Sequence, residues 1–382
     1  MLSGVHKVAS CPSNLGSTAY NLTKGLRSSD CLKESASSKN LSRGDTIYEP
    51  FYALPEANLK TLDAVSIDYD QLEVGENQLK TSKDLLKENG VVLLDNVPLH
   101  KKSDLSSLAD AFGVGMDYVG GTNKRDRSSN ILNVGSEPPF VNVAFHNEMS
   151  YSHWYPETFI IGCIKAPSTG GETVIGDNEK FTLDLQKTSL GRKLEDNGLI
   201  YIRNFHDQNN PIQTSMVSWQ EVFGTENREE AADKARNVLA GGEKFHIDWR
   251  ENGGMRISYK APAFEYDPTT NMNLCFASIG NSGYWFRQWS PFNMVENEDR
   301  PFHMLFGDGT EFSEHELDQM VRLMSRHSIP IKWKPGRVAV LDNRRWTHAR
   351  PPYELLPGEE REMGVALLGP TARSGPRTPL YV

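Results

Sequence analysis

The chain has 382 residues, of which 38% are hydrophobic and 24% are charged, a composition typical of a globular protein whose core needs no disulfide support. Its 41 basic and 50 acidic residues give a formal net charge of −9 and form no long basic run, so nucleic acid and anionic membranes are poor candidates as partners. No apolar stretch approaches the roughly 20 residues needed to span a bilayer, and the four scattered cysteines indicate reduced, intracellular usage rather than a disulfide framework or a zinc ribbon.

The N-terminal stretch 1–44 is rich in Ser, Asn and basic residues and poor in acidic ones. Two interpretations fit this composition: a disordered tail, or a peptide for import into an organelle, which also tends to be Ser-rich and acid-poor. We expect residues 1–48 to form a poorly structured extension and residues 49–382 to form a single domain. The expected location is intracellular and most simply cytoplasmic, with organelle import through residues 1–44 as the alternative.

Regular patterning in the domain begins with a helix followed by a strand. Residues 78–90 have helical spacing and end at a glycine, and the apolar run 91–97 predicts a buried strand. Ser103 is a candidate N-cap for a second helix that continues through Ala111. Beyond it, short apolar or alternating runs are bounded by Gly, Pro, Asn or Asp, as in an all-β barrel or sandwich. These predicted strands are 159–166, 172–177, 198–205, 255–261, 273–280, 329–333, 337–343 and 363–369.

Helical segments interrupt the predicted strands at three places. Residues 178–196 and 227–242 have helical character, and the second segment ends at a double glycine. Residues 313–328 open with Ser313 and Glu316 in the spacing of a capping box. Helices that flank a β core favour one elaborated jelly roll over two separate domains. The expected fold class is therefore mainly β with flanking helices (α+β), built on a double-stranded β-helix (jelly-roll) core.

Two histidines and a glutamate stand out as candidate metal ligands. His146 and Glu148 lie in VAFHNEMSY, and His348 lies in VLDNRRWTHARPP. Two imidazoles and one carboxylate are the ligand set of a mononuclear non-haem iron(II) site, which leaves the other metal positions open. Residues two apart on a strand point to the same side, so His146 and Glu148 are expected to reach one metal from a semi-buried strand. Taken alone, His-x-Glu is also common in surface strands, and His348 beside Trp346 equally fits a satisfied core histidine.

Further short sequences surround these three residues in a particular order. The stretch from about Val91 to Leu368 resembles the taurine dioxygenase/clavaminate synthase-like family of iron(II)- and 2-oxoglutarate-dependent oxygenases, especially its plant-type clavaminate synthase-like branch. Five pieces in register make the resemblance specific. They are DYVGG (117–121), FHNEMSY (145–151), GGETVIGD (170–177), FGDG (306–309) and LDNRRWTHARPPY (341–353), the last followed by Arg361.

The resemblance implies iron(II) as the metal of the His146, Glu148 and His348 set, with 2-oxoglutarate as cosubstrate and O2 as oxidant. It also implies that Thr173 hydrogen-bonds one carboxylate of 2-oxoglutarate, although GGET alone is equally a turn before a strand. A halogenase would leave the carboxylate position empty, and Glu148 occupies it here. The resemblance makes Glu148 the carboxylate ligand, at a position where many relatives have Asp.

Arg361 follows His348 by 13 residues, the interval at which the family places the arginine that binds the far carboxylate of 2-oxoglutarate. A guanidinium group suits this role because it stays charged and can contact a carboxylate through two parallel hydrogen bonds. Arg350 and Arg373 are the other arginines near in sequence. Arg350 is expected to lie too close to the metal ligand to span the cosubstrate.

Recognition of the substrate is the least determined part of the site. By resemblance, Asn142 and Tyr118 are candidate substrate contacts. Arg203 and Arg287 could bind an anionic substrate, although a surface ion pair is the more common fate of such arginines. An amino acid or a small polar acid is the expected substrate class, and segments 204–226 and 281–302 are candidates for a lid. The oligomeric state is left open.

The resemblance implies abstraction of hydrogen from an unactivated C–H bond, with release of succinate and CO2. Hydroxylation, desaturation and ring closure are all possible outcomes, and a kainoid synthase-like or clavaminate synthase-like oxidative cyclase is the alternative within this class. A jelly-roll protein that binds a metal or metabolite without turnover is the rival from another class. A cupin-like enzyme without 2-oxoglutarate is a third interpretation, against which Thr173 and Arg361 count. Motifs of phosphate-binding loops, serine hydrolases and zinc proteases are absent from the sequence.

Overall fold

The computed structural model describes residues 65–69, 76–118, 127–128, 131–133, 137–212, 215–241, 245–280, 285–288 and 290–377. The expected N-terminal extension 1–48 lies outside these residues, as do the last three residues of DYVGG. Contacts group Ile47–Val382 into one compact unit, and the description below concerns this unit alone. No helix in the described residues is long and apolar enough to cross a membrane.

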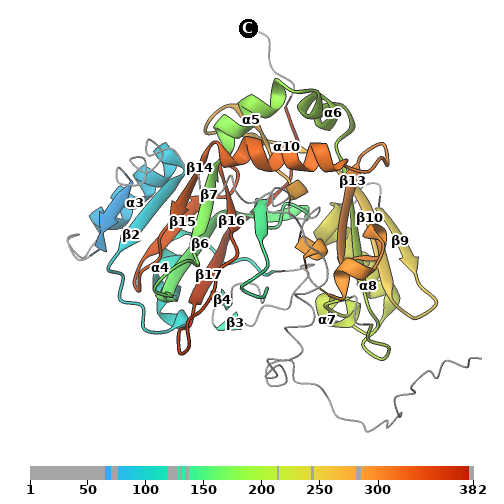
Figure 1. Cartoon of the computed structure of the whole chain (residues 1–382), viewed down its shortest axis with the longest axis horizontal. Coiled ribbons are helices and arrows are strands. Elements are labelled where there is room, and N and C mark those ends of the chain that lie inside the picture. The colour runs from blue at the N-terminus through green and yellow to red at the C-terminus, as the bar shows by residue number, and fades with distance from the viewer. Residues whose placement is uncertain are drawn as a thin grey trace, which may run out of the picture. The chain divides into compact units, whose positions relative to one another are not determined.

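Two facing β-sheets form the jelly roll on the left of Figure 1. The larger sheet has seven strands, in the order β1 (Ser66–Asp68), β2 (Val91–Asp95), β15 (Val338–Asp342), β6 (Trp154–Lys165), β17 (Glu362–Ala372), β4 (Ile131–Asn133) and β3 (Arg127–Ser128). The smaller sheet has four, in the order β14 (Ser328–Ile331), β7 (Thr173–Asp177), β16 (Trp346–Arg350) and β5 (Val143–His146). These sheets confirm the expected mainly β, double-stranded β-helix core.

Strand β2 shows why its sequence, VVLLD, is almost entirely apolar. Its side chains alternate between the two faces of the sheet. Val91 and Leu93 belong to the hydrophobic cluster between the two sheets, whereas Val92 and Leu94 belong to a second cluster on the outer face. Each fully buried side chain of this kind contributes about 1.5–3 kcal/mol to stability. Both faces of the larger sheet are therefore covered at this strand.

Helices α3 (Glu76–Asn89) and α4 (Ser106–Phe112) supply partners for the outer face. The helix expected to begin at Ser103 differs from the prediction. A 3-10 turn, Lys102–Leu105, leads directly into α4, and Ser103 does not cap it. Asp104, at the third position of this turn, stabilises its start instead, because its Oδ2 accepts hydrogen bonds from the backbone N–H groups of His100 and Lys101 at 2.9 and 3.0 Å.

A third sheet of four strands lies to the right of the jelly roll in Figure 1. Its order is β13 (Phe302–Phe306), β8 (Leu199–Phe205), β10 (Met255–Ala261) and β9 (Phe245–Trp249). A hairpin of β11 (Phe264–Asp267) and β12 (Met272–Cys275) follows β10 in the chain and precedes β13. The strands predicted at 198–205 and 255–261 therefore belong to a separate sheet and not to the jelly roll. The strand predicted over 273–280 is shorter than expected, since β12 ends at Cys275.

The remaining helices lie along the top of the view and beside the lower part of the third sheet (Figure 1). They are α5 (Asn178–Gln186), α6 (Ser189–Asn197), α7 (Trp219–Phe223), α8 (Arg228–Ala235), continued by a π-helical turn (Arg236–Ala240), and α10 (Glu314–Ser325), with 3-10 turns at Trp285–Arg287, Phe292–Met294 and Asn297–Asp299. The segment predicted as helical over 178–196 is broken in two, because Thr188 caps α6 by accepting a hydrogen bond from Gly191 N. The capping box of Ser313 and Glu316 at the start of α10 is confirmed.

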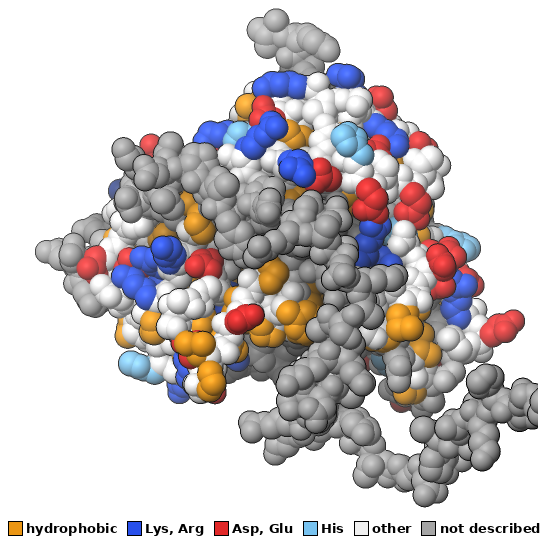
Figure 2. Space-filling view, viewed as in Figure 1, with side chains coloured by type: hydrophobic (Ala, Val, Ile, Leu, Met, Phe, Trp, Pro, Cys, Tyr) orange, Lys and Arg blue, Asp and Glu red, His pale blue; other side chains and the backbone are white. Residues whose placement is uncertain are grey.

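Charged side chains of both signs are interspersed over the described part of the face shown in Figure 2. Several are paired along helices, for example Lys187 with Asp184 at 2.9 Å and Arg322 with Asp318 at 2.6 Å. Exposed pairs of this kind contribute little to stability. The chemistry that distinguishes the molecule is found inside it, between the sheets.

Candidate metal centre

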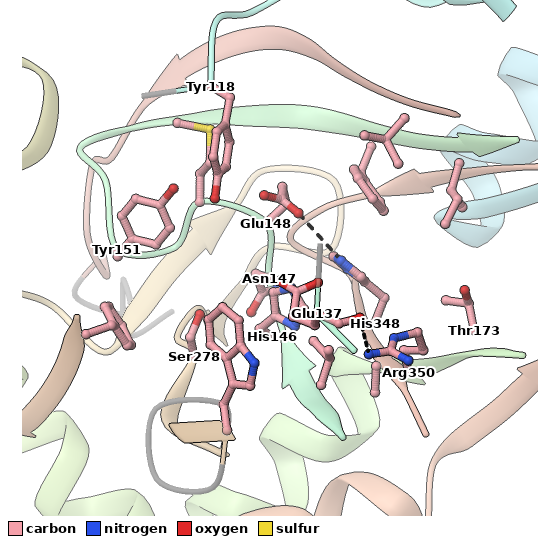
Figure 3. Close-up of a pocket in the computed structure, with 18 of the residues that line it drawn as sticks. Tyr118, Glu137, His146, Asn147, Glu148, Tyr151, Thr173, Ser278, His348 and Arg350 are labelled. Atoms are coloured by element: carbon pink, nitrogen blue, oxygen red, sulfur yellow. Dashed lines mark hydrogen bonds and ion pairs between the residues drawn. The ribbon is translucent and has the colours of Figure 1, made fainter. Parts of the chain in front are cut away.

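The three candidate metal ligands meet inside the jelly roll (Figure 3). His146 is the last residue of β5, and His348 lies directly opposite it on β16, with the two ring centroids 4.2 Å apart. Glu148 approaches from the turn after β5, and its Oε2 is 3.6 Å from His348 Nε2. One ligand atom from each residue lies within 4.8 Å of the others. Strands separated by about 200 residues in the sequence thus bring the set together.

Glu148 reaches this position by a different route from the one predicted. Strand β5 ends at His146, and residues 148–150 form a turn in which Met149 has a positive φ of 55°. Asn343 holds this turn in place through two hydrogen bonds: Glu148 N donates to Asn343 Oδ1 at 2.7 Å, and Asn343 Nδ2 donates to Glu148 O at 2.9 Å. The carboxylate is therefore directed by a tertiary contact and not by the alternation of a strand.

Hydrogen bonding and stacking orient the two imidazoles. His146 Nδ1 lies 2.9 Å from the carbonyl oxygen of Ala144. Because a carbonyl only accepts, Nδ1 carries the proton and Nε2 keeps a lone pair for a metal. The ring of His348 stacks on Phe159, with centroids 4.4 Å apart and planes inclined by 17°. Two imidazoles and a buried carboxylate on one side of an open space fit a divalent first-row metal such as iron.

A pocket opens beside this set of ligands. Its empty space, including the open mouth, is about 970 Å³. Figure 3 shows Thr173 and Arg350 on one side of the three ligands and Tyr118 and Tyr151 on the other. The pocket therefore has two ends, which we call the Thr173 end and the Tyr151 end, with the candidate metal ligands between them.

Arg361 and Thr173 lie at the same end of the pocket. Thr173 begins β7, is buried, and accepts a hydrogen bond from Trp333 Nε1 at 3.1 Å. Arg361 precedes β17 and donates from Nε to the carbonyl oxygen of Gly171 at 2.8 Å. Its two terminal nitrogens have no hydrogen-bond partner among the described residues. Burial lowers the pKa of Arg361 to about 10, and the charge of Arg350 adds to this shift, so the group is still cationic at neutral pH.

Arg350 and Arg373, the other two candidates for binding 2-oxoglutarate, are hydrogen-bonded to backbone oxygens of the protein. Arg350 lines the pocket, but its guanidinium donates to the backbone oxygens of Pro138, Pro139 and Val141 at 3.0–3.3 Å. Arg373 donates to backbone oxygens such as that of Ser150 at 2.9 Å and is not part of the pocket lining. Of Arg350, Arg361 and Arg373, Arg361 is the one that presents donors to the pocket without a partner among the described residues.

The candidate substrate contacts divide into two pairs. Tyr118 and Arg203 line the pocket. Asn142 and Arg287 do not: Asn142 is buried and pairs through its backbone with Gln288, and Arg287 forms an ion pair with Glu314 beside a separate small cavity. These two residues therefore lie outside the lining of the pocket in which we expect the substrate.

Several residues that line the pocket or support its metal ligands were missed by reasoning from the sequence. Asn343 and Tyr151 lie inside the motifs quoted above, so their position next to metal ligands was a usable signal. Ser278 and Trp285 line the pocket without any motif around them. Ser278 Oγ is 2.6 Å from Ser150 Oγ. Nothing in the local sequence pointed to either residue.

Comparison with known proteins identifies one family and several relatives. The family model described as taurine catabolism dioxygenase TauD, TfdA family matches residues 52–367. A clavaminate synthase-like protein of Arabidopsis thaliana is 26% identical over 285 residues, which cover 72% of this chain and 83% of that protein. The dapdiamide synthesis protein DdaC of Enterobacter agglomerans is 22% identical over 313 residues, which cover 78% of this chain and 87% of that protein.

Among solved structures, the chain also matches a putative alpha-ketoglutarate-dependent taurine dioxygenase from Burkholderia xenovorans. It has a TM-score of 0.46 and 15% sequence identity, and the match covers 82% of this chain and 88% of that one. The PvcB protein from Pseudomonas aeruginosa gives a TM-score of 0.44 at 15% identity, covering 79% and 84%. The match of the family model over most of the length shows that the chain belongs to the TauD/TfdA family, as an Fe(II)-dependent dioxygenase that uses 2-oxoglutarate and O2.

Proposed function

We propose that His146, Glu148 and His348 bind the iron, that Thr173 and Arg361 bind 2-oxoglutarate beside it, and that the enzyme oxidises a C–H bond of a small, amino-acid-like acid. The observation that carries this proposal is one juxtaposition. Three ligand atoms within 4.8 Å of one another share a pocket with an arginine whose terminal donors have no partner among the described residues.

Each end of the pocket has a defined task in this proposal. Iron with 2-oxoglutarate and O2 supplies the power to remove hydrogen from an unactivated C–H bond, with succinate and CO2 as by-products. Arg361 would bind the far carboxylate through two parallel hydrogen bonds, which orients the cosubstrate as well as holding it. Thr173 would add a hydrogen bond from its hydroxyl group. Phe159, stacked on His348, keeps the ligand ring in place and limits the access of water.

The Tyr151 end of the pocket is the part left for the substrate. Tyr118 and Tyr151 line it together with Trp285 and Ser278, a mixture of aromatic faces and hydroxyl groups that suits a small molecule with polar ends. Burial raises the pKa of Tyr151 well above its ordinary value, so its phenol stays protonated and available as a donor. An intracellular location fits this function, since 2-oxoglutarate is a metabolite of the cell interior.

Oxidative ring closure is the second candidate outcome, beside hydroxylation and desaturation. It is favoured by the names of the two curated relatives, a clavaminate synthase-like protein and a dapdiamide synthesis protein, which both point to biosynthesis. The position of the substrate carbon next to the metal decides among these outcomes. Mass analysis of the product separates them: a gain of one oxygen indicates hydroxylation, whereas loss of two hydrogens indicates desaturation or ring closure, which NMR then distinguishes.

The test is anaerobic loading of the protein with Fe(II) and 2-oxoglutarate, read by the visible absorption band that arises when the cosubstrate chelates iron. We expect the band in the wild type and its absence in His348→Ala and Glu148→Ala, with succinate formation at background in both variants. His246→Ala is the matched control, because His246 is exposed on β9. A band of full strength in either ligand variant would refute the assignment of the metal site.

A further inference from the structure

Arg203 is the most unusual side chain in the described part of the molecule. It lies on β8 of the third sheet, is 0% exposed, and lines the same pocket as the candidate metal ligands. None of its three guanidinium nitrogens has a hydrogen-bond partner among the described residues. From this arrangement we propose that Arg203 binds an oxyanion of the substrate, a carboxylate or a sulfonate, at the Tyr151 end of the pocket. The inference deepens the proposed function and rests on it for the identity of the pocket.

Other buried arginines in the described residues show what the fold normally provides. Arg345 donates to Glu179 Oε1 at 2.6 Å and to two backbone oxygens at 2.9 and 3.1 Å. Arg344 donates to Glu157 Oε1 at 2.6 Å, and Arg300 donates to Phe292 O at 3.1 Å. A buried cation without such partners is costly, because it has lost its hydration and gained no hydrogen bond in return. The missing partner of Arg203 is therefore best supplied by a ligand.

Aromatic rings hold the guanidinium of Arg203 without satisfying its donors. Its central carbon lies 4.4 Å from the ring centroid of Tyr151, 5.1 Å from that of Phe302 and 5.7 Å from that of Phe205. Such contacts stabilise the positive charge through the ring faces. They leave the N–H groups, which lie in the guanidinium plane, free to donate. A planar fork of donors matches a carboxylate, and the same donors fit two oxygens of a sulfonate.

The position of Arg203 links it to the metal side of the pocket through Tyr151. The ring centroid of Tyr151 lies 4.4 Å from the central carbon of Arg203, and its phenol is also close enough to Tyr118 and Glu148 to interact with them electrostatically. A substrate anion bound to Arg203 would therefore place the carbons next to that anion toward the metal. Arg203 also comes from a different sheet than Arg361, which separates anion recognition in the substrate from anion recognition in the cosubstrate.

The direct test compares each acid with its neutral counterpart. Free L-amino acids, N-acetyl-L-amino acids and ω-aminosulfonates are screened beside their primary amides or sulfonamides, by thermal shift and by perturbation of the iron–cosubstrate absorption band. We expect the best acid to bind wild type roughly 10- to 100-fold more tightly than its amide. The carboxylate and sulfonate arms decide which oxyanion the site prefers. If no acid exceeds its amide, the proposal is wrong.

Three variants assign that preference to Arg203. In Arg203→Met the preference for acid over amide should fall to about one, and in Arg203→Lys it should be intermediate, because the charge remains but the fork is lost. Arg256→Met is the matched control. Arg256 lies on the neighbouring strand β10, opposite Asn204 of β8, forms an ion pair with Asp299, and is not part of the pocket lining. It should keep the full preference. An undiminished preference in Arg203→Met would overturn the proposal.

The melting temperature of the metal-free protein distinguishes a ligand-binding arginine from a structural one. Replacing a structural arginine should lower this temperature, whereas replacing Arg203 should not. Arg203→Met removes a buried cation that has no hydrogen bonds to the described residues, so the melting temperature of the variant should equal or exceed that of the wild type. A clear fall in melting temperature, with the acid preference unchanged, would identify Arg203 as a structural residue.

Two outcomes separate this inference from the proposed function. Arg203→Met should form the iron–cosubstrate absorption band as the wild type does, because Arg203 is not assigned to iron or 2-oxoglutarate. If the wild type itself forms no band, the proposed function fails, while the thermal shifts of acids against amides in metal-free protein still report on Arg203. If the band is lost in Arg203→Met alone, Arg203 belongs to the cosubstrate site and the inference is wrong.

Discussion

Arg361 and Arg203 line one pocket, but the fold supports their charges in different ways. Arg361 comes from the jelly roll, is partly exposed, and is anchored through one hydrogen bond to Gly171 O. Arg203 comes from the third sheet, is fully buried, and is held by aromatic rings alone as far as the described residues go. An anchored arginine suits a cosubstrate that always binds in one orientation. An arginine held only by rings has all its donors left for a ligand. The orientation of its guanidinium therefore depends more on the bound substrate.

Arg361→Leu is expected to have the largest effect: it should weaken binding of 2-oxoglutarate but not binding of the substrate acid at Arg203. Loss of a buried partner of a carboxylate costs about 2–5 kcal/mol, which corresponds to roughly 30- to 5,000-fold weaker binding of 2-oxoglutarate. Titration of the iron–cosubstrate absorption band measures it directly. Binding of the best acid from the screen, followed by thermal shift in metal-free protein, should remain within about twofold of wild type. Equal losses of both ligands would mean that the two ends are not independent.

Asn343→Asp is expected to have an intermediate effect, acting through the turn that carries Glu148. The substitution replaces the Nδ2 donor by an oxygen that faces Glu148 O and Pro156 O, which Asn343 contacts at 2.9 Å each. Positioning partners of this kind change metal affinity or activity by about 10- to 100-fold, and the lost hydrogen bonds cost about 1–3 kcal/mol of stability.

The measurement is iron affinity by competition with a chelator, beside the melting temperature. Asn343 forms no part of the described pocket lining, so the acid preference assigned to Arg203 should survive in the folded variant. Wild-type iron affinity in Asn343→Asp would show that the turn keeps its position without this contact.

The pH dependence of 2-oxoglutarate binding gives the smallest expected effect. Burial lowers the pKa of Arg361 to about 10 in the ligand-free protein, and a bound carboxylate raises it again. Affinity should therefore be constant well below pH 10 and fall as the pH rises through about 10, since binding must then restore the lost proton. The expected loss is roughly three- to tenfold between pH 8 and pH 10.5–11.

Calorimetry with 2-oxoglutarate, with circular dichroism to verify that the protein stays folded, measures this step. Arg361→Leu should show no such step because the titrating group is absent. A step of the same size in that variant would assign the pH dependence to another group.

The fold was largely predictable because its signals are local. Short apolar runs bounded by turn residues indicated strands, and most of them are strands, while the capping box at Ser313 marks the start of α10 as expected. What local signals did not reveal was which sheet each strand joins. Strand β8 reads like the others, but its partners are β10 and β13. Sheet membership depends on pairing between distant segments, and a strand carries no local record of its partner.

The site was predictable to the extent that its residues lie in motifs. His146, Glu148, His348, Thr173 and Arg361 were selected from the sequence, and the structure brings all of them to one pocket. Their roles as ligands of iron and 2-oxoglutarate stay predictions for the experiments above. Asn142 and Arg287 were selected in the same way but lie elsewhere, because residue type and spacing do not report the direction of a side chain.

By itself, the sequence determined the class of fold, the choice of the candidate metal ligands and the resemblance to an oxygenase family, since these depend on residue types and local order. The tertiary structure alone decided how Glu148 reaches the metal side, through a turn held by Asn343 and not through strand alternation. It also decided that Arg203 is buried, faces the pocket and has no hydrogen bonds to described residues. Burial and the absence of partners are properties of packing between distant segments, and only the folded chain brings those segments together.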